Sequence, residues 1–191
     1  MNKGKIIIIS GPSGSGKTTL FKKLLENNQL KKCLVRSISV TTRFPRPGEK
    51  NGRDYIFVSP KMFLFRRRRG HFLESEKVFG NYYGTPARNV FKLIDSGKNV
   101  LLCIDVNGAK HIQQKFPDAI EIFIKTSSKG ILKQRLKKRG SEDKETVLLR
   151  LQRAEKELKE SKKFDHIIIN DYLPKAYRNL EKLIQKIVKN S

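Results

Sequence analysis

The chain has 191 residues, of which 42 are lysine or arginine and 18 are aspartate or glutamate, giving a formal net charge of +24. This length suits one domain with insertions and is enough to bury a substantial core. Hydrophobic residues make up 37% of the sequence and no apolar run approaches the roughly 18 residues of a membrane span, so the composition favours a soluble globular protein over a membrane protein.

The positive charge fits a polyanionic partner or small phosphorylated ligands. A generally lysine-rich composition explains it equally well, because the lysines are scattered along the whole chain. Cys33 and Cys103 lie far apart without metal-ligand spacing, as expected for reduced thiols. The first aliphatic run is far too short for a signal-peptide core, so we expect a cytoplasmic protein. Nothing in the sequence indicates an oligomeric state.

A glycine-rich segment follows the aliphatic run of residues 6–9 almost at once. Residues 11–18 match the phosphate-loop pattern G-x-x-x-x-G-K-[ST] in full, and apolar residues at helical spacing come next. Glycine permits the positive φ that turns backbone N–H groups toward a phosphate, while Lys17 can reach the β- and γ-phosphates and Thr18 can bind Mg²⁺. The alternative is an unrelated glycine-rich turn. The pattern predicts an ATP site formed by Gly11, Pro12, Ser13, Gly14, Ser15, Gly16, Lys17, Thr18 and Thr19.

Aliphatic runs at 6–9, 100–104, 120–124 and 167–169 alternate with helical patterns. Short β-branched runs of this kind are typical of strands buried on both faces, and their alternation with helices indicates a parallel sheet. Helices are expected at 107–116, 129–139, 146–159 and around 180–187, and the helix at 146–159 is expected to have Leu148, Leu151 and Leu158 on one side. The predicted fold class is therefore α/β, with a parallel sheet flanked by helices.

Residues 37–96 interrupt this rhythm. Polar β-prone residues at 37–43 are followed by turn signals at 45–48 and 51–52, a strand at 55–58 and a helix near 60–69. This pattern predicts a small, partly antiparallel insertion. The helix carries four consecutive arginines, Arg66 to Arg69, for which a solvated outer face is favoured over a nucleic-acid contact.

Several polar groups in the insertion predict a second ligand pocket. Arg43 and Arg46, three residues apart on a proline-restrained segment, can grip one phosphate from two sides. A carboxylate, tyrosine hydroxyls and a threonine hydroxyl follow at 74, 82–83 and 85. Beyond the insertion, Asp105 follows the strand at 100–104, where P-loop proteins hold Mg²⁺, usually through water.

These motifs resemble those of guanylate kinases, which transfer the γ-phosphate of ATP to GMP. The resemblance covers essentially the whole chain and rests on residues 11–18, the segments 41–49 and 51–55, Gly80-Asn81-Tyr82-Tyr83-Gly84 and Ile169-Asn170-Asp171. It implies a nucleoside monophosphate kinase of purine nucleotide metabolism that converts GMP or dGMP, with ATP and Mg²⁺, to GDP or dGDP. The implied division is a core of residues 1–36, 97–128 and 160–191, a GMP-binding insertion of residues 37–96, and a lid of residues 129–159.

The resemblance also implies roles for individual residues. The GMP phosphate would be held by Arg43, Arg46, Tyr55 and Tyr83, the base would be read by Ser39, Glu74 and Thr85, and Asp105 would lie beside them. Guanine presents N1–H and N2–H₂ as adjacent donors that one carboxylate, Glu74, can accept together, whereas adenine offers an acceptor at N1. Arg135, Arg139 and Arg150 would close over ATP, and Asn170 would lie near adenine.

The implied chemistry is direct in-line displacement without a covalent intermediate. A phosphate oxygen of GMP is already an anionic nucleophile, so no general base is needed. Catalysis would depend on positioning and electrostatics from Lys17, Arg43, Arg135 and Arg150.

Two features depart from the family pattern. Cys103 stands where an acid is usual, so Asp105 would have to act alone or the site is weaker, and the four-arginine run is unusually basic. Three alternatives stay open: a non-catalytic guanylate-kinase-like protein-interaction module, which predicts a damaged phosphate loop; a P-loop ATPase acting on nucleic acid; and a kinase for another small phosphate ester.

Overall fold

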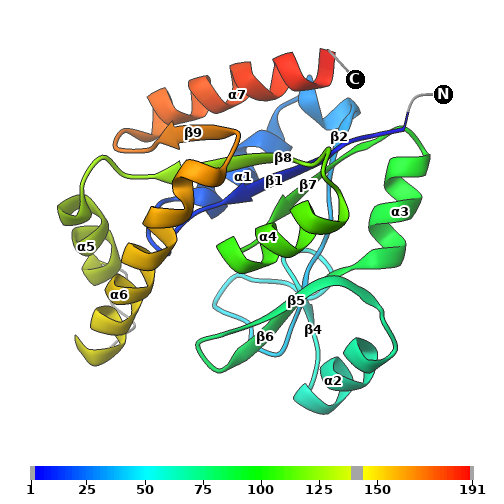
Figure 1. Cartoon of the computed structure of the whole chain (residues 1–191), viewed down its shortest axis with the longest axis horizontal. Coiled ribbons are helices and arrows are strands. Elements are labelled where there is room, and N and C mark those ends of the chain that lie inside the picture. Colours follow the sequence, from blue (N-terminus) through cyan, green and yellow to red (C-terminus); the bar gives the residue numbers. More distant parts are fainter. Residues whose placement is uncertain (1–2, 139–143, 190–191) are drawn as a thin grey trace.

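A computed structural model describes residues 3–138 and 144–189 of the chain (Figure 1). Its centre is a sheet of five parallel strands in the order β2-β7-β1-β8-β9. Four of them coincide with the predicted aliphatic runs, and the prediction of an α/β fold is confirmed. The strands are β1 (Ile6–Ser10), β2 (Leu34–Arg36), β7 (Asn99–Cys103), β8 (Ile120–Lys125) and β9 (His166–Ile169).

Helices cover both faces of this sheet (Figure 1). Successive side chains of β1 point to opposite faces, so Ile7 and Ile9 pack against α1 (Lys17–Glu26) and α7 (Leu173–Lys189), while Ile6 and Ile8 face α3 (Ala87–Asp95) and α4 (Val106–Lys115). The helical spacing expected near the end of the chain is confirmed by α7, which buries Leu180, Ile184 and Ile187. Two short 3₁₀ helices lie at Leu30–Lys32 and Ser161–Lys163.

A second, four-stranded sheet lies within the predicted insertion, in the order β4-β3-β6-β5. Its β3–β4 pair is parallel and its other two pairs are antiparallel, as the prediction of a partly antiparallel insertion requires. The helix α2 (Pro60–Arg68) buries Phe63 between the rings of Phe72 and Tyr82, and it leaves Arg67 and Arg68 exposed. The strands are β3 (Val40–Thr41), β4 (Ile56–Phe57), β5 (Phe72–Val78) and β6 (Asn81–Pro86).

The helices α5 (Lys129–Lys138) and α6 (Lys144–Glu160) project from one end of the central sheet (Figure 1). A small apolar cluster holds them together, formed by Leu132, Leu136 and Ala154 with Leu151 packed against it. Leu148, expected on the same apolar side, is instead 57% exposed because this cluster ends one turn short of it. Among the described residues, no helix combines the length and apolar character needed to cross a membrane.

The parallel strands place several chain segments at one edge of the sheet. The carboxyl end of β1 leads into the glycine-rich loop, that of β7 into Asp105, and that of β9 into Asn170. In open α/β sheets ligands bind outside the carboxyl ends of the strands, so this edge is where a site is expected.

Candidate active site

The phosphate loop has the backbone conformation that its glycines were expected to supply. Gly14 and Gly16 have φ values of 86° and 87°. A Cβ on Gly16 would lie 2.2 Å from Nδ2 of Asn170, which donates a 2.8 Å hydrogen bond to the carbonyl of Ser15. Asn170, predicted to lie near adenine, is thus buried against the loop and fixes its shape.

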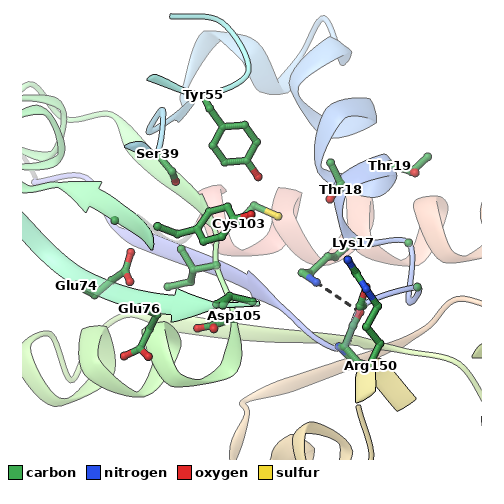
Figure 2. A pocket seen from close by; sticks show the side chains of 18 of the residues that line it. Lys17, Thr18, Thr19, Ser39, Tyr55, Glu74, Glu76, Cys103, Asp105 and Arg150 are labelled. Carbon is green, nitrogen blue, oxygen red and sulfur yellow. Dashed lines mark hydrogen bonds between the residues drawn. The ribbon is translucent and has the colours of Figure 1, made fainter. Parts of the chain in front are cut away.

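Lys17 begins α1 and lies across the mouth of the loop. Its Nζ donates to the carbonyl of Pro12 at 3.4 Å, and Arg150 of α6 approaches from the opposite side, donating from Nη1 to Oγ of Ser13 at 3.0 Å (Figure 2). The hydroxyl-bearing side chains of Thr18 and Thr19 are exposed beside them. Two cations therefore lie against a glycine-rich loop at the start of a helix, an arrangement that suits a polyphosphate.

A cavity of about 180 Å³ separates the phosphate loop from the second sheet. It brings together most of the predicted residues from both nucleotide sites (Figure 2). On the loop side it is lined by Pro12, Ser13, Gly14, Gly16, Lys17, Thr18 and Thr19, and on the other sides by Ser39, Arg46, Tyr55, Glu74, Tyr83, Asp105 and Arg150. An adjoining cavity of about 420 Å³ adds Gly11 and Arg43.

Glu74 is the buried carboxylate of the first cavity, with a relative exposure of 7%. Oγ1 of the fully buried Thr85 donates to Oε1 of Glu74 at 2.5 Å. Burial raises the pKa of Glu74 to about 7, against the opposing effect of the Thr85 hydrogen bond. The carboxylate is thus poised between its neutral and ionised forms near neutral pH, and a ligand that donates to it would favour the ionised form.

Tyr55 and Arg43 form a second polar group, on the side of the cavities that the insertion of residues 37–96 provides. Burial raises the pKa of Tyr55 to about 12, so its phenol stays protonated and can donate to an anion. The Arg43 guanidinium lies 5.5 Å from the Tyr55 ring centroid and pairs through Nη2 with Oε1 and Oε2 of Glu49 at 3.0 and 2.9 Å. Oε2 also accepts from the backbone N–H of Arg46 at 2.9 Å. Glu49 therefore fixes the guanidinium of Arg43 and the backbone of Arg46.

Asp105 has two partners in this structure. Its Oδ1 accepts from the backbone N–H of Gly108 at 2.8 Å and so caps α4, while its Oδ2 pairs with Nη2 of Arg153 at 2.7 Å. Arg153 also pairs with Glu157 at 2.8 Å on the same helix. The sequence analysis missed both lid residues, although an Arg–Glu pair at i,i+4 is a recognisable helical signal.

Glu76 was also missed, and it lines the same cavity as Glu74. The two glutamates lie two positions apart on β5, so their side chains emerge on one face of the sheet (Figure 2). The strand period could have identified Glu76 once Glu74 was chosen. Its Oε1 lies 3.0 Å from Nδ1 of His111.

Four predicted site residues of the described chain line neither of these two cavities. Among the described residues, Ser15, Thr85 and Asn170 stand behind the lining, and Arg135 turns toward the chain after β9, donating to the carbonyls of Asn170 at 2.7 Å and Asp171 at 2.9 Å. Arg139 lies outside the described residues. Of the lid arginines that were predicted, Arg150 is therefore the one that lines the described cavities, and Arg153, which was not predicted, lies beside it.

Cys103, which departs from the family pattern, ends β7 and lines the cavity between Tyr55 and Asp105 (Figure 2). Burial raises the pKa of its thiol, so it is neutral where an acid was expected. Within residues 3–138 and 144–189, no group of three or more histidine, cysteine or acidic side chains could hold a metal ion. Thr18 and Asp105 line the same cavity and carry oxygen atoms of the kind that Mg²⁺ prefers, although both carboxylate oxygens of Asp105 already have protein partners.

Asp54 holds the loop before β4 against α1. It is 6% exposed, accepts from the backbone N–H of Lys50 at 3.0 Å and pairs with Lys22 of α1 at 3.1 Å. These contacts, with Arg53, hold the pKa of the Asp54 carboxyl well below its usual range. The carboxylate therefore stabilises the fold above its unfolded pKa of about 3.9, and this contribution is lost as the pH falls below that value.

We expect Asp54→Asn to lower the free energy of unfolding by about 1 kcal/mol at pH 7, because charge-assisted hydrogen bonds are lost. Urea unfolding of both proteins at pH 7 and at pH 3.5 measures this. The difference between them is expected to shrink at the lower pH, and a difference that persists undiminished would show that the charge of Asp54 is not its source.

Comparisons with known proteins agree with one another. The family model for guanylate kinase matches residues 3–187. The chain is 43% identical over 183 residues to a guanylate kinase of Clostridium perfringens, covering 96% of this chain and 83% of that protein. It is 40% identical over 188 residues to one of Rubrobacter xylanophilus, covering 98% and 97%. The crystal structure of guanylate kinase from Anaplasma phagocytophilum superposes with a TM-score of 0.80 at 33% identity, covering 97% and 86%.

Proposed function

Because the chain belongs to the guanylate kinase family, we propose that it transfers the γ-phosphate of ATP to GMP, giving ADP and GDP. The observation that carries this proposal is the position of Glu74, a buried carboxylate that faces a complete phosphate loop across one cavity. One side of the cavity suits a purine base with adjacent N–H donors, and the other suits a triphosphate.

On the acceptor side, Glu74 accepts from N1–H and N2–H₂ of guanine and Ser39 donates toward O6. Thr85 contributes to reading the base from behind the lining, by donating to Oε1 of Glu74 and so orienting that carboxylate. Arg43, Arg46, Tyr55 and Tyr83 hold the phosphate of GMP. Support comes from the Arg43–Glu49 pair, which keeps that arginine aimed before substrate binds, and from the protonated phenol of Tyr55. A pocket built in advance lowers the entropy lost on binding.

On the donor side, residues 11–19 cradle the phosphates of ATP, with Lys17 and Arg150 neutralising the charge of the transferring group. Arg135, Arg139 and Asn170 complete this side as the lid of residues 129–159 closes. Thr18, and Asp105 through water, would hold Mg²⁺, which supplies further neutralisation of phosphate charge. The insertion of residues 37–96 carries GMP, and the remaining residues form the core.

The alternatives have weaker support. A non-catalytic interaction module predicts a damaged phosphate loop, and this loop keeps every motif residue together with its glycine conformations. A kinase for a phosphate ester without adjacent N–H donors would give Glu74 no role in recognising its substrate. An ATPase acting on nucleic acid would account for the net charge, yet the cavity beside the phosphate loop is lined by the carboxyl groups of Glu74, Glu76 and Asp105, which do not favour a phosphate backbone.

A coupled assay for ADP formation tests the proposal. With ATP and Mg²⁺ present, GMP and dGMP are expected to be phosphorylated, and AMP, UMP and CMP to react at most at about 10⁻⁴ of that rate, since their bases lack the adjacent N–H donors that this site is built to accept. Absence of turnover with GMP would exclude the proposed activity. Stimulation of ATP hydrolysis by RNA or DNA would instead support the nucleic-acid alternative.

The raised pKa of Glu74 predicts a pH dependence of GMP binding. GMP favours the ionised carboxylate, so below pH 7 Glu74 must lose a proton before GMP binds. The Kd for GMP is therefore expected to rise up to about tenfold for each unit by which the pH falls below 7. Calorimetry at pH 6, 7 and 8 measures this. The phosphate of GMP itself titrates near about pH 6, so Glu74→Gln, in which the amide does not titrate, is the reference. Equal pH slopes in the two proteins would contradict the prediction.

A further inference from the structure

The turn between β5 and β6 has an unfavourable residue in it. Its two residues, Phe79 and Gly80, have φ values of 47° and 79°, and the flanking Val78 and Asn81 pair across the hairpin. Two-residue turns with positive φ at both positions favour Asn or Gly at the first. Among the described residues, Phe79 is the one non-glycine residue with positive φ. A phenylalanine is unfavourable in this backbone conformation, which indicates that its side chain has a role outside the turn.

The Phe79 ring contacts two arginines of the lid helix. The guanidinium of Arg150 lies 4.7 Å from the ring centroid and that of Arg153 lies 5.4 Å from it. Attraction between a cation and the face of an aromatic ring operates at these distances. The ring is 40% exposed, so it reaches this contact at the surface, where α6 meets the hairpin.

Each partner in this contact belongs to a different nucleotide site. Phe79 follows the strand that carries Glu74 and precedes the strand that carries Tyr83, both on the acceptor side. Arg150 donates to Ser13 of the phosphate loop, and Arg153 pairs with Asp105 at the end of β7. The contact therefore joins the hairpin of the second sheet to the lid helix, and its geometry depends on how these two elements are placed relative to each other.

We propose that Phe79 is a positioning residue that couples the two substrate sites, so that each nucleotide tightens the binding of the other. This inference rests on the proposed function. GMP fixes the hairpin through Glu74 and Tyr83, while ATP fixes α6 through Arg150. The nucleotide that binds first orders one of the two elements, and the contact through Phe79 helps to order the other. The second nucleotide therefore binds with a smaller loss of conformational entropy. By linkage, the two enhancement factors must be equal.

Calorimetry of the full chain tests the coupling with GMP and a non-hydrolysable ATP analogue. For the wild type, the analogue with Mg²⁺ is expected to lower the Kd for GMP at least about fivefold, and GMP to lower the Kd for the analogue by the same factor. In Phe79→Asn the factor is expected to fall to about one, while the Kd for each nucleotide alone changes less than about twofold. Asn before Gly80 is a preferred pair for this turn, so the hairpin keeps its conformation.

Phe65→Asn is the matched control. Phe65 is an exposed phenylalanine of α2 whose ring lies 4.5 Å from the guanidinium of Arg69, and it lines neither cavity. This variant is expected to keep the wild-type factor. Equal factors in the wild type and Phe79→Asn, or a wild-type factor of one, would overturn the coupling even if GMP is phosphorylated normally. Failure of the wild type to phosphorylate GMP, with the factors as expected, would instead overturn only the proposed function.

Discussion

Replacing Lys17 with alanine is expected to lower kcat for GMP phosphorylation by about 10³-fold or more, with little effect on the melting temperature. Lys17 is the cation at the mouth of the phosphate loop, and preorganised charges on a transferring phosphoryl group account for rate factors of this order. The fold is expected to persist because the glycine conformations and the Asn170 contact, rather than the 3.4 Å bond from Lys17 to Pro12, fix the loop.

The coupled ADP assay, with thermal unfolding alongside, measures both effects. Lys23→Ala is the control, since Lys23 is an exposed lysine of the same helix and its loss makes the same change in net charge. That variant is expected to keep the wild-type rate. A Lys17→Ala protein that retains its rate would show that the phosphate loop does not take part in the chemistry.

Replacing Glu74 with glutamine is expected to lower kcat/KM for GMP on the order of 10²-fold and to leave the Kd for the ATP analogue within about twofold. The amide offers one acceptor where guanine needs two, and its NH₂ group faces other donors in a buried place. The hydroxyl of Thr85, which donates to the Glu74 carboxylate at 2.5 Å, finds no better acceptor in the glutamine amide.

Steady-state kinetics with varied GMP measures the loss. Glu76→Gln is the matched control, because Glu76 lines the same cavity two positions along β5 and faces His111. It is expected to change kcat/KM for GMP less than about tenfold. Unchanged GMP affinity in Glu74→Gln would move recognition of the base to other residues.

The parts of the fold that were predicted from sequence are those encoded locally. Four central strands were visible as aliphatic runs, and the phosphate loop as a contiguous motif. The strand β2 was missed because its three residues, Leu34–Arg36, are too few to show a period. The apolar side of α6 was partly wrong at Leu148, because the helix meets a small cluster on α5 rather than a broad core.

In the site, contacts between distant segments were the ones that residue patterns could not predict. Arg153 pairs with Asp105 across 48 positions of sequence, and Arg150 reaches Ser13 across 137. Each of these contacts depends on where α6 packs in the folded protein, and the spacing of residues within α6 does not encode that position. The boundaries proposed for the insertion and the lid remain predictions from the family resemblance.

The hydrogen bond from Asn170 to the phosphate loop has a consequence for when the ATP site forms during synthesis of the protein. The motif lies near the start of the chain, yet the side chain that holds the Ser15 carbonyl arrives 155 positions later, after the final strand of the sheet. A nascent chain therefore displays the whole motif long before the donor site is finished. High-affinity ATP binding is expected to begin only once β9 has left the ribosome and joined β8, so nucleotide binding reports that all five strands of the central sheet are in place.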